Sequence, residues 1–453
     1  MTAKLTRREM LKLSASVTAG AILASCTPAA APTTAPAPAA AATSAPVAVP
    51  PKKASGKIVT MWNDNELSKD EIATFMKKYP GLTVEFLTFD EPRLMAMLAA
   101  GTAPDHIRAV GLETPYFASK NIWLDQTPYV QASSKIKMDD LLPCNDMNKY
   151  KDGLYGIIKD WSPDFSLWIN HGMMAAAGID LPATDKGIDL NWLRETSKKL
   201  TKTEGDRTLV YGFDNGVWDG RFLNKAMIDA GGQMWSDSYD KLLLRDNQKA
   251  KDFLKFLTDW ALEKTCTSPI NPATDWGGPN FSNGISAIIC QGYWYSGMLE
   301  QNQSKVVASM FPAWTYTTTK MYNPCGYGAS GAISAQSKNP EAAWAFQEYF
   351  MTEEPAITRA KSGWGVPSLK SLLPLMPQTG DFRAPLYKLT MELAATGLPP
   401  LPANPFARLA AFDQPNAKYQ EMYLRKEISF DDYIGKVEDE VNATVSDEIS
   451  RRL

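Results

Sequence analysis

The chain has 453 residues, 44% hydrophobic and 21% charged, which is typical of a soluble globular protein with more than one lobe or domain. A formal net charge of −3 with scattered basic residues excludes the basic footprint of proteins that bind nucleic acid or an anionic membrane surface. Only His106 and His171 are present, so a histidine-based zinc site or a catalytic histidine pair is nearly excluded by count. We expect no metal and no cofactor.

Residues 1–26 have the pattern of a signal peptide. A basic start with Arg7 and Arg8 precedes a mildly apolar segment, 13–24, that is too short to span a bilayer. "TRREMLK" resembles a twin-arginine export signal, and "LASC" resembles a bacterial lipobox. We therefore expect cleavage before Cys26 and lipidation of its thiol.

Residues 27–56 are almost wholly Ala, Pro, Thr and Ser. Such a segment buries too little apolar surface to offset its ordering entropy, and its prolines favour an extended polyproline II chain. At about 3.1 Å per residue it would reach up to roughly 90 Å. We expect a disordered tether that holds a soluble body at the outer face of the cytoplasmic membrane, periplasmic or extracellular, with the lipid anchor as its only membrane contact.

Four further cysteines follow the tether: Cys144, Cys266, Cys290 and Cys325. In an oxidising compartment they would allow two disulfides in any of three pairings, between which the sequence does not choose. Four buried thiols are the alternative, because Cys290 lies in an apolar run where a free cysteine packs well.

The folded body opens with a strand, a helix and a second strand. Residues 58–62 form a short apolar run, and Ser68 with Glu71 makes a capping box for a helix that "PG" at 80–81 ends. The alternating run "LTVEFLTF" then predicts a strand, so the order is that of a parallel βαβ unit. A further helix and a strand at about 106–110 repeat the pattern.

Polar side chains follow these strands. Asn63 and Asp64 come directly after the first strand, and Glu113 follows the third. Ligands of open α/β sheets bind at the carboxyl ends of strands, so these residues are candidates for a binding site. The alternative is that each is only a helix cap.

Several later helices are also predicted. Asn339 precedes a helix with Pro340 at its first position, and a final helix from Ser429 carries an apolar stripe. The stretch "IICQGYWYSG" at 288–297 joins an apolar run to three aromatic residues. By itself it is equally typical of core and of a surface that stacks on a ligand.

From Gly56 to its end, the chain resembles the extracytoplasmic solute-binding proteins of ABC importers, in the branch that includes maltose-binding protein. The matching pieces occur in the family's order: "FMKKYPGLTVEF", "AAGTAPD", "DGLYGI", "LWINHGMMAAAGIDLP", "AGGQMW", "FSNGISAIICQGYW" and "SKNPEAAWAFQEYF". The ordered set over nearly the whole body carries the resemblance, whereas single pieces are weak.

The resemblance implies an α/β fold of two lobes, each a mainly parallel sheet flanked by helices, with a ligand cleft at a hinge of several crossings. One lobe would comprise 57–161 plus 309–362. The other would comprise 165–306 plus 366–453. The crossings would fall near Trp161, Ala308 and Trp364.

The resemblance also implies a site for sugar, in which an aromatic ring supports the apolar face and polar side chains bind the hydroxyls. "GYW" places Trp294 under a sugar ring. Asp219 and Arg221 align with cleft positions before "AGG", Asp164 with the hinge carboxylate, and Asn63, Asp64 and Glu113 with strand ends. Loop placement alone adds Trp62, Trp161, Trp218, Tyr327, Trp364 and Arg408. For all of them, structural aromatics and ion pairs are the alternative.

We therefore expect a monomer that is not an enzyme, captures a carbohydrate by lobe closure and delivers it to ABC permease subunits. No nucleic acid is expected as a partner. A lipid-anchored carbohydrate-active enzyme is the alternative, although G-x-S-x-G, H-E-x-x-H and P-loop signatures are absent. The same fold binding a peptide or a polyamine is another alternative.

Overall fold

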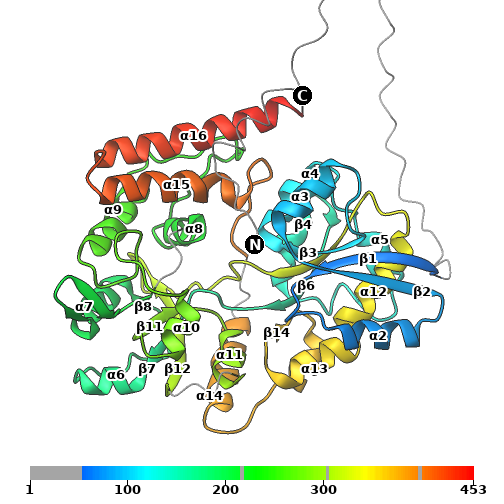
Figure 1. The fold of residues 1–453 in the computed structure, drawn as a ribbon, viewed down its shortest axis with the longest axis horizontal. Helices are drawn as coiled ribbons and strands as arrows, with labels where there is room; N and C mark the ends of the chain where they lie inside the picture. The colour runs from blue at the N-terminus through cyan, green and yellow to red at the C-terminus, as the bar shows by residue number, and fades with distance from the viewer. Residues whose placement is uncertain (1–53, 215–218, 302–305, 396–399, 453) are drawn as a thin grey trace, which may run out of the picture. The chain divides into compact units, whose positions relative to one another are not determined.

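The computed structural model of the chain describes residues 54–214, 219–301, 306–395 and 400–452 (Figure 1). The predicted signal segment, Cys26, most of the tether and Trp218 lie outside the described residues. Within those ranges no helix is long and apolar enough to cross a membrane. The same ranges contain no group of three or more metal-ligating side chains that could hold an ion.

The first lobe is built on a six-stranded sheet in the order β14-β6-β13-β3-β1-β2. Its strands are β1 (Gly56–Trp62), β2 (Leu82–Thr88), β3 (His106–Val110), β6 (Ile157–Trp161), β13 (Ala329–Ile333) and β14 (Val366–Pro367). β1 pairs in parallel with β2 and β3, whereas the other three pairings are antiparallel. The pairings put β1, β2, β3 and β6 in one direction, and β13 enters between β3 and β6 against that direction.

Local sequence signals account for the first βαβ unit. α2 (Lys69–Lys78) begins at Ser68, whose side chain accepts from the Glu71 backbone while the Glu71 side chain accepts from Ser68. This is the predicted capping box, and it satisfies backbone donors that a helix start leaves unpaired. β1 and β2 then pair in register from Gly56 with Leu82 to Trp62 with Thr88. The predicted parallel βαβ unit is confirmed.

The second lobe is built on a four-stranded sheet in the order β11-β7-β12-β8. Its strands are β7 (Ser166–Asn170), β8 (Ile188–Asp189), β11 (Ile288–Cys290) and β12 (Ala308–Thr315). β7 is antiparallel to both β11 and β12, and only the pairing of β12 with β8 is parallel. In this sheet β8, β11 and β12 therefore run in one direction and β7 runs against them.

The chain crosses between the sheets later than the predicted segments imply. β12 belongs to the second sheet, although 309–362 was expected in the first lobe. β14 belongs to the first sheet, although 366–453 was expected in the second lobe. The return crossings therefore fall after Thr315 and after Pro367. The partners of these strands are distant along the chain, so no local pattern indicates which sheet each strand joins.

The remaining elements cover the sheets and their edges (Figure 1). The first-lobe region contains α3 (Glu91–Ala99), η1 (Gly111–Glu113), α4 (Thr114–Ser119), α5 (Thr127–Ala132), η2 (Pro143–Asn148), β4 (Lys149–Tyr150), β5 (Gly153–Leu154), α12 (Pro340–Thr352), α13 (Glu354–Ser362) and η3 (Lys370–Leu375). The later region contains α6 (His171–Ala176), α7 (Leu190–Leu200), β9 (Lys202–Glu204), β10 (Arg207–Val210), α8 (Gly220–Asp229), α9 (Gln248–Leu262), α10 (Gly277–Ser282), α11 (Tyr295–Gln301), α14 (Arg383–Ala395), α15 (Leu409–Leu424) and α16 (Phe430–Ser450).

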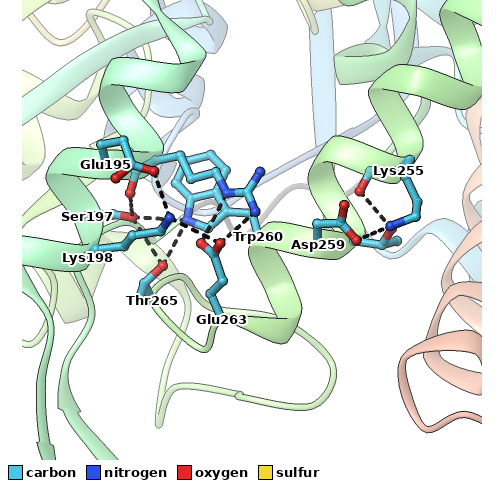
Figure 2. A network of polar contacts seen from close by, with 10 residues as sticks. Glu195, Ser197, Lys198, Lys255, Asp259, Trp260, Glu263 and Thr265 are labelled. Atoms are coloured by element: carbon cyan, nitrogen blue, oxygen red, sulfur yellow. Dashed lines mark hydrogen bonds and ion pairs between the residues drawn. The ribbon is translucent and has the colours of Figure 1, made fainter.

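A polar network joins α7 to α9 and the segment after it (Figure 2). The Trp260 indole N–H donates to Ser197 Oγ at 3.0 Å and to Thr265 Oγ1 at 3.1 Å. Glu263 pairs with Lys198 at 3.2 Å between Nζ and Oε1. Because Trp260 is almost fully buried, these bonds satisfy a donor that would otherwise be costly to bury. The network is structural and lies apart from the cavity described below.

The four cysteines of the body, Cys144, Cys266, Cys290 and Cys325, are free and buried. Their burial raises the pKa of each thiol well above its ordinary value. Of the two alternatives left open by the sequence, the structure therefore has buried thiols.

Candidate functional site

A cavity of about 390 Å³ lies between residues of both lobes. Three half-buried aromatic rings and several charged side chains line it. They come from the connection between β1 and α2, the strands β3 and β6, the connection from β6 to β7, the start of α8, the turn after β11 and the segments flanking β13 and α13. Ligand pockets of proteins have this size, and aromatic side chains commonly line them.

The first ring is that of Trp294, in the turn after β11. Trp276 stacks on it with ring centroids 6.1 Å apart and an interplanar angle of 27°, and Tyr295 meets it edge-on at 5.8 Å. Tyr293 and Tyr295 are fully buried, so of the three aromatic residues in "GYWYSG" only Trp294 lines the cavity. The stretch thus combines a buried strand, two core tyrosines and one ring that faces the cavity.

The second ring, Tyr327, lies between two guanidinium groups. Arg108 is 5.7 Å and Arg221 is 5.4 Å from its centroid. Cations near an aromatic ring are attracted to its electron-rich face, so these contacts hold the ring in place. The third ring, Trp364, follows α13 and is also half-buried.

Charges in the cavity are balanced. Its cations are Arg108, Lys159 and Arg221, and its carboxylates are Glu66, Asp160 and Asp164. Arg108 Nε binds Glu66 Oε2 at 2.6 Å, and Lys159 Nζ binds Asp160 Oδ2 at 2.5 Å. Arg221 binds Asp219 at 2.6 Å just outside the lining and faces the charge of Asp164. The cavity therefore offers hydrogen-bonding groups without a large excess of either charge.

Asp164 has one carboxylate oxygen held and one available. Oδ2 accepts from the backbone N–H groups of Gly326 at 2.7 Å and Tyr327 at 3.1 Å. Among the described residues none donates to Oδ1, and the neighbouring Ser162 Oγ is buried without a hydrogen-bond partner. Burial raises the pKa of Asp164 to about 6, although the two N–H groups and Arg221 oppose the shift. These two atoms are the polar groups that a ligand would satisfy.

Position 292 requires glycine, because it packs directly against Ser162 and Asp164. A Cβ atom at this position would overlap the Ser162 hydroxyl and lie 2.7 Å from Asp164 Oδ1. Glycine at this position lets the turn before Trp294 pass close to Ser162 and Asp164, which together form the floor of the cavity.

Changing Gly292 to alanine is expected to weaken ligand binding about tenfold, because Ser162 and Asp164 must move to make room for the methyl group. Calorimetric titration of the two proteins measures the effect. Gly172→Ala is the matched control, since a Cβ there lies no closer than 3.5 Å to its neighbour, Asn170. Equal affinities for the Gly292→Ala variant and the parent would contradict the placement of the ligand against this floor.

The structure brings together some of the predicted site residues and leaves others outside the cavity. Those that line it are Asp164, Arg221, Trp294, Tyr327 and Trp364. Trp62 and Trp161 are buried in the cores of the lobes, and Asp219 caps α8 while holding Arg221. Asn63 and Asp64 precede the two residues, Asn65 and Glu66, that line the cavity in their place.

Glu113 and Arg408 do not line the cavity but pair with one another, and we call this pair and the contacts below the rim contacts. Arg408 Nη2 lies 2.8 Å from Glu113 Oε2 and 2.6 Å from Glu91 Oε1. Nearby, Lys120 Nζ binds Glu448 at 2.9 Å. These rim contacts join α3, η1 and α4 to the start of α15 and the end of α16.

Sequence reasoning missed several lining residues, namely Asn65, Glu66, Arg108, Lys159, Asp160, Ser162 and Gln291. Asn65 and Glu66 belong to the polar stretch after the first predicted strand, in which Asn63 and Asp64 are the predicted candidates. Asp160 and Ser162 flank Trp161, which is itself a predicted candidate. Arg108 and Lys159 had a different signal: each is a single basic residue within an otherwise buried strand. A buried charge requires a partner, so such a residue marks an ion pair or a site.

Solved structures of similar fold include an ABC substrate-binding protein from Listeria monocytogenes in complex with cycloalternan, with a TM-score of 0.74 and 19% identity over 86% of this chain and 99% of that one. A solute-binding protein of an ABC transporter from Thermotoga lettingae, bound with α-D-tagatose, has a TM-score of 0.70 and 19% identity, over 86% of this chain and 100% of that one. A maltose/maltodextrin-binding domain from Bdellovibrio bacteriovorus bound to maltotriose has a TM-score of 0.67 and 16% identity, over 87% of this chain and 100% of that one.

These likenesses confirm the two-lobed α/β fold. A comparison with curated proteins found no match. The sequence profile of one family, described as bacterial extracellular solute-binding protein, matches residues 63–357, which is more than half of the chain. The chain belongs to the family of bacterial extracellular solute-binding proteins.

Proposed function

We propose that the protein captures a carbohydrate in the cavity between its lobes and delivers it to the permease of an ABC importer. The observation that carries the proposal is the lining: three half-buried aromatic rings together with charges that pair with one another. A pyranose presents an apolar face and a rim of hydroxyls, which such a lining matches. A strongly charged ligand would instead find the side chains of opposite charge already paired with one another.

The similar structures support the ligand class, since those reported above hold cycloalternan, tagatose and maltotriose. Lipidation of Cys26 and a tether to about residue 56 would keep the body close to the permease on the outer face of the membrane. The ligand would shift the equilibrium toward the closed lobes, and the size of the shift equals the difference between its binding free energies for the closed and the open lobes.

A thermal-shift screen of the full chain against a broad panel of sugars, peptides and polyamines tests the ligand class. A ligand that binds the folded state raises the melting temperature, by an amount that follows its concentration relative to Kd. We expect stabilisation by at least one carbohydrate, recovered chemically unchanged. Stabilisation by peptides or polyamines alone would overturn the sugar assignment, and consumption of the sugar would favour the enzyme.

Ligand affinity is expected to rise about threefold to tenfold between about pH 5 and pH 7. Asp164, with its pKa raised to about 6, is protonated at the lower pH and ionised at the higher. An ionised carboxylate is the stronger acceptor for a sugar hydroxyl, so binding improves as the proton leaves. Titration of the best sugar at several pH values measures the change.

Two variants isolate the group responsible for this pH dependence. In Asp164→Asn, affinity is expected to be low and to show no step with pH. Asp413 also has a raised pKa, from burial first and the nearby Asp219 carboxylate second, so Asp413→Asn is the control and should retain the step. A step that survives in Asp164→Asn would contradict the assignment.

Changing Arg408 to glutamine is expected to weaken ligand binding about fivefold, because closure then loses a rim contact worth about 1 kcal/mol. Glu113 is 8% and Arg408 17% exposed, so the pair is more shielded than an ordinary surface pair. Calorimetric titration at low and high salt measures both the loss and its screening. Arg425→Gln is the matched control, since Arg425 directly follows α15 and pairs with Glu421 four residues earlier. Equal losses in both variants would contradict a role for the rim contacts in closure.

A further inference from the structure

A second cavity of about 460 Å³ lies next to the site. It shares Asn65, Glu66 and Trp364 with the first cavity. Its other lining residues come from the connection before α2 and its first turn, from α11 and from α13, and include Asp64, Glu71, Glu300, Thr358 and Arg359. In Figure 1, α11 and α13 lie on the far side of the sheets from α3, α4 and α15, which carry the rim contacts. Because the two cavities share these lining residues, a ligand in the first cavity can extend into the second.

Trp364 forms part of both cavities. A Cβ atom on Gly297 would lie 2.6 Å from Trp364 Cε3, so the edge of the indole rests directly on the α11 backbone. Such close packing leaves the ring little freedom to rotate. A fixed, half-buried indole shared by two adjoining cavities is suited to contact two consecutive apolar faces of one ligand.

Arg359 supplies an unused donor to the second cavity. Its Nη2 donates to the Phe350 carbonyl at 2.7 Å, and its guanidinium lies 4.4 Å from the Phe350 ring centroid. Nη1 is buried and has no hydrogen-bond partner among the described residues. A buried donor without a partner is costly, so a ligand acceptor at this position would be stabilising.

The carboxylates of the second cavity already accept hydrogen bonds from protein groups. Glu71 is engaged in the capping box, Asp64 Oδ1 accepts from Thr88 at 2.8 Å, and Glu300 binds Arg383. Glu66 is paired with Arg108. Arg359 Nη1 is thus a donor available to a ligand in a cavity that the Trp364 indole also lines, which suits a hydroxylated ring better than a cation.

We propose that the ligand is an oligosaccharide of at least two rings. One ring lies in the first cavity against Trp294, and the next lies in the second cavity against Trp364, where Arg359 Nη1 donates to one of its oxygens. This inference rests on the proposed function, because it assigns the chain length of the sugar that the site would bind.

Calorimetric titration of the full chain with matched sugar series tests the inference. The probes are glucose with maltose and maltotriose, glucose with cellobiose and cellotriose, mannose with mannobiose and mannotriose, and xylose with xylobiose and xylotriose. In at least one series we expect the disaccharide to bind at least tenfold more tightly than its monosaccharide. Binding of monosaccharides as tightly as disaccharides would overturn the chain length and leave the proposed function standing. Binding of no probe would contradict both.

Two variants locate the second ring. Thr358→Trp places bulk in the second cavity from an exposed position on α13 and should lower disaccharide affinity at least tenfold, with monosaccharide affinity unchanged within twofold. Arg359→Gln should have the same selective effect, and Arg425→Gln should have none. Thr358→Trp keeps the test valid if Arg359→Gln fails to fold. Disaccharide affinity equal to that of the parent in Thr358→Trp would overturn the placement.

Discussion

Changing Trp294 to alanine is expected to weaken carbohydrate binding nearly a hundredfold. The indole is held in place by Trp276 on one face and by Tyr295 at its edge, and it lines the cavity. If a sugar covers about 100 Å² of the ring, burial at about 25 cal/mol per Å² contributes about 2.5 kcal/mol. Because the ring is held before the ligand arrives, little of this is lost to ordering the side chain.

Calorimetric titration with the sugar that gives the largest thermal shift measures the loss. Trp192→Ala is the control: Trp192 is also a half-buried tryptophan, but it lies on α7 and does not line the cavity. We expect its affinity to stay within twofold of the parent. A Trp294→Ala variant that binds as tightly as the parent would remove this ring from the site.

Changing Lys225 to methionine is expected to lower the free energy of unfolding by about 3 to 5 kcal/mol. The Lys225 and Asp229 side chains are 0% and 1% exposed, and Nζ lies 2.7 Å from Oδ2. Nζ also lies 4.0 Å from the centroid of the Trp314 ring. Burial lowers the pKa of Lys225 and raises that of Asp229, while their mutual attraction opposes both shifts. Removing the lysine leaves a buried carboxylate without its countercharge.

Urea unfolding followed by tryptophan fluorescence measures this loss. Lys255→Met is the matched control, because Lys255 and Asp259 have the same spacing on α9 but are 47% and 35% exposed (Figure 2). That change is expected to cost less than about 1 kcal/mol. The double variant Lys225→Met, Asp229→Leu should recover most of the loss, since it removes both buried charges. A single variant as stable as the parent would show that the pair contributes nothing.

Local patterns in the sequence predicted the elements that local chemistry determines. The capping box at Ser68, the strand at 106–110 and the helix after Ser429 all lie where expected, because each depends on residues close by in the sequence. The apolar stripe on α16 is likewise buried at Tyr433 and Val437.

Strand partners and charge partners were not predictable in the same way. β13 pairs with β3 and β6 across more than 150 residues, and the sequence carries no local signal for its antiparallel direction. The same holds for Arg108 with Glu66, which are 42 residues apart, and for Arg408 with Glu113, which are 295 apart. Predicted site residues such as Trp62 are core residues, since an aromatic residue at a strand end fits either environment.

Reversible capture of a carbohydrate without turnover is tested by titrating the full chain calorimetrically with the best sugar from the screen. We expect saturable heat for one site, no continuing heat after each injection and full recovery of the sugar. A steady heat of reaction, or saturable binding only by peptides or polyamines, would contradict it.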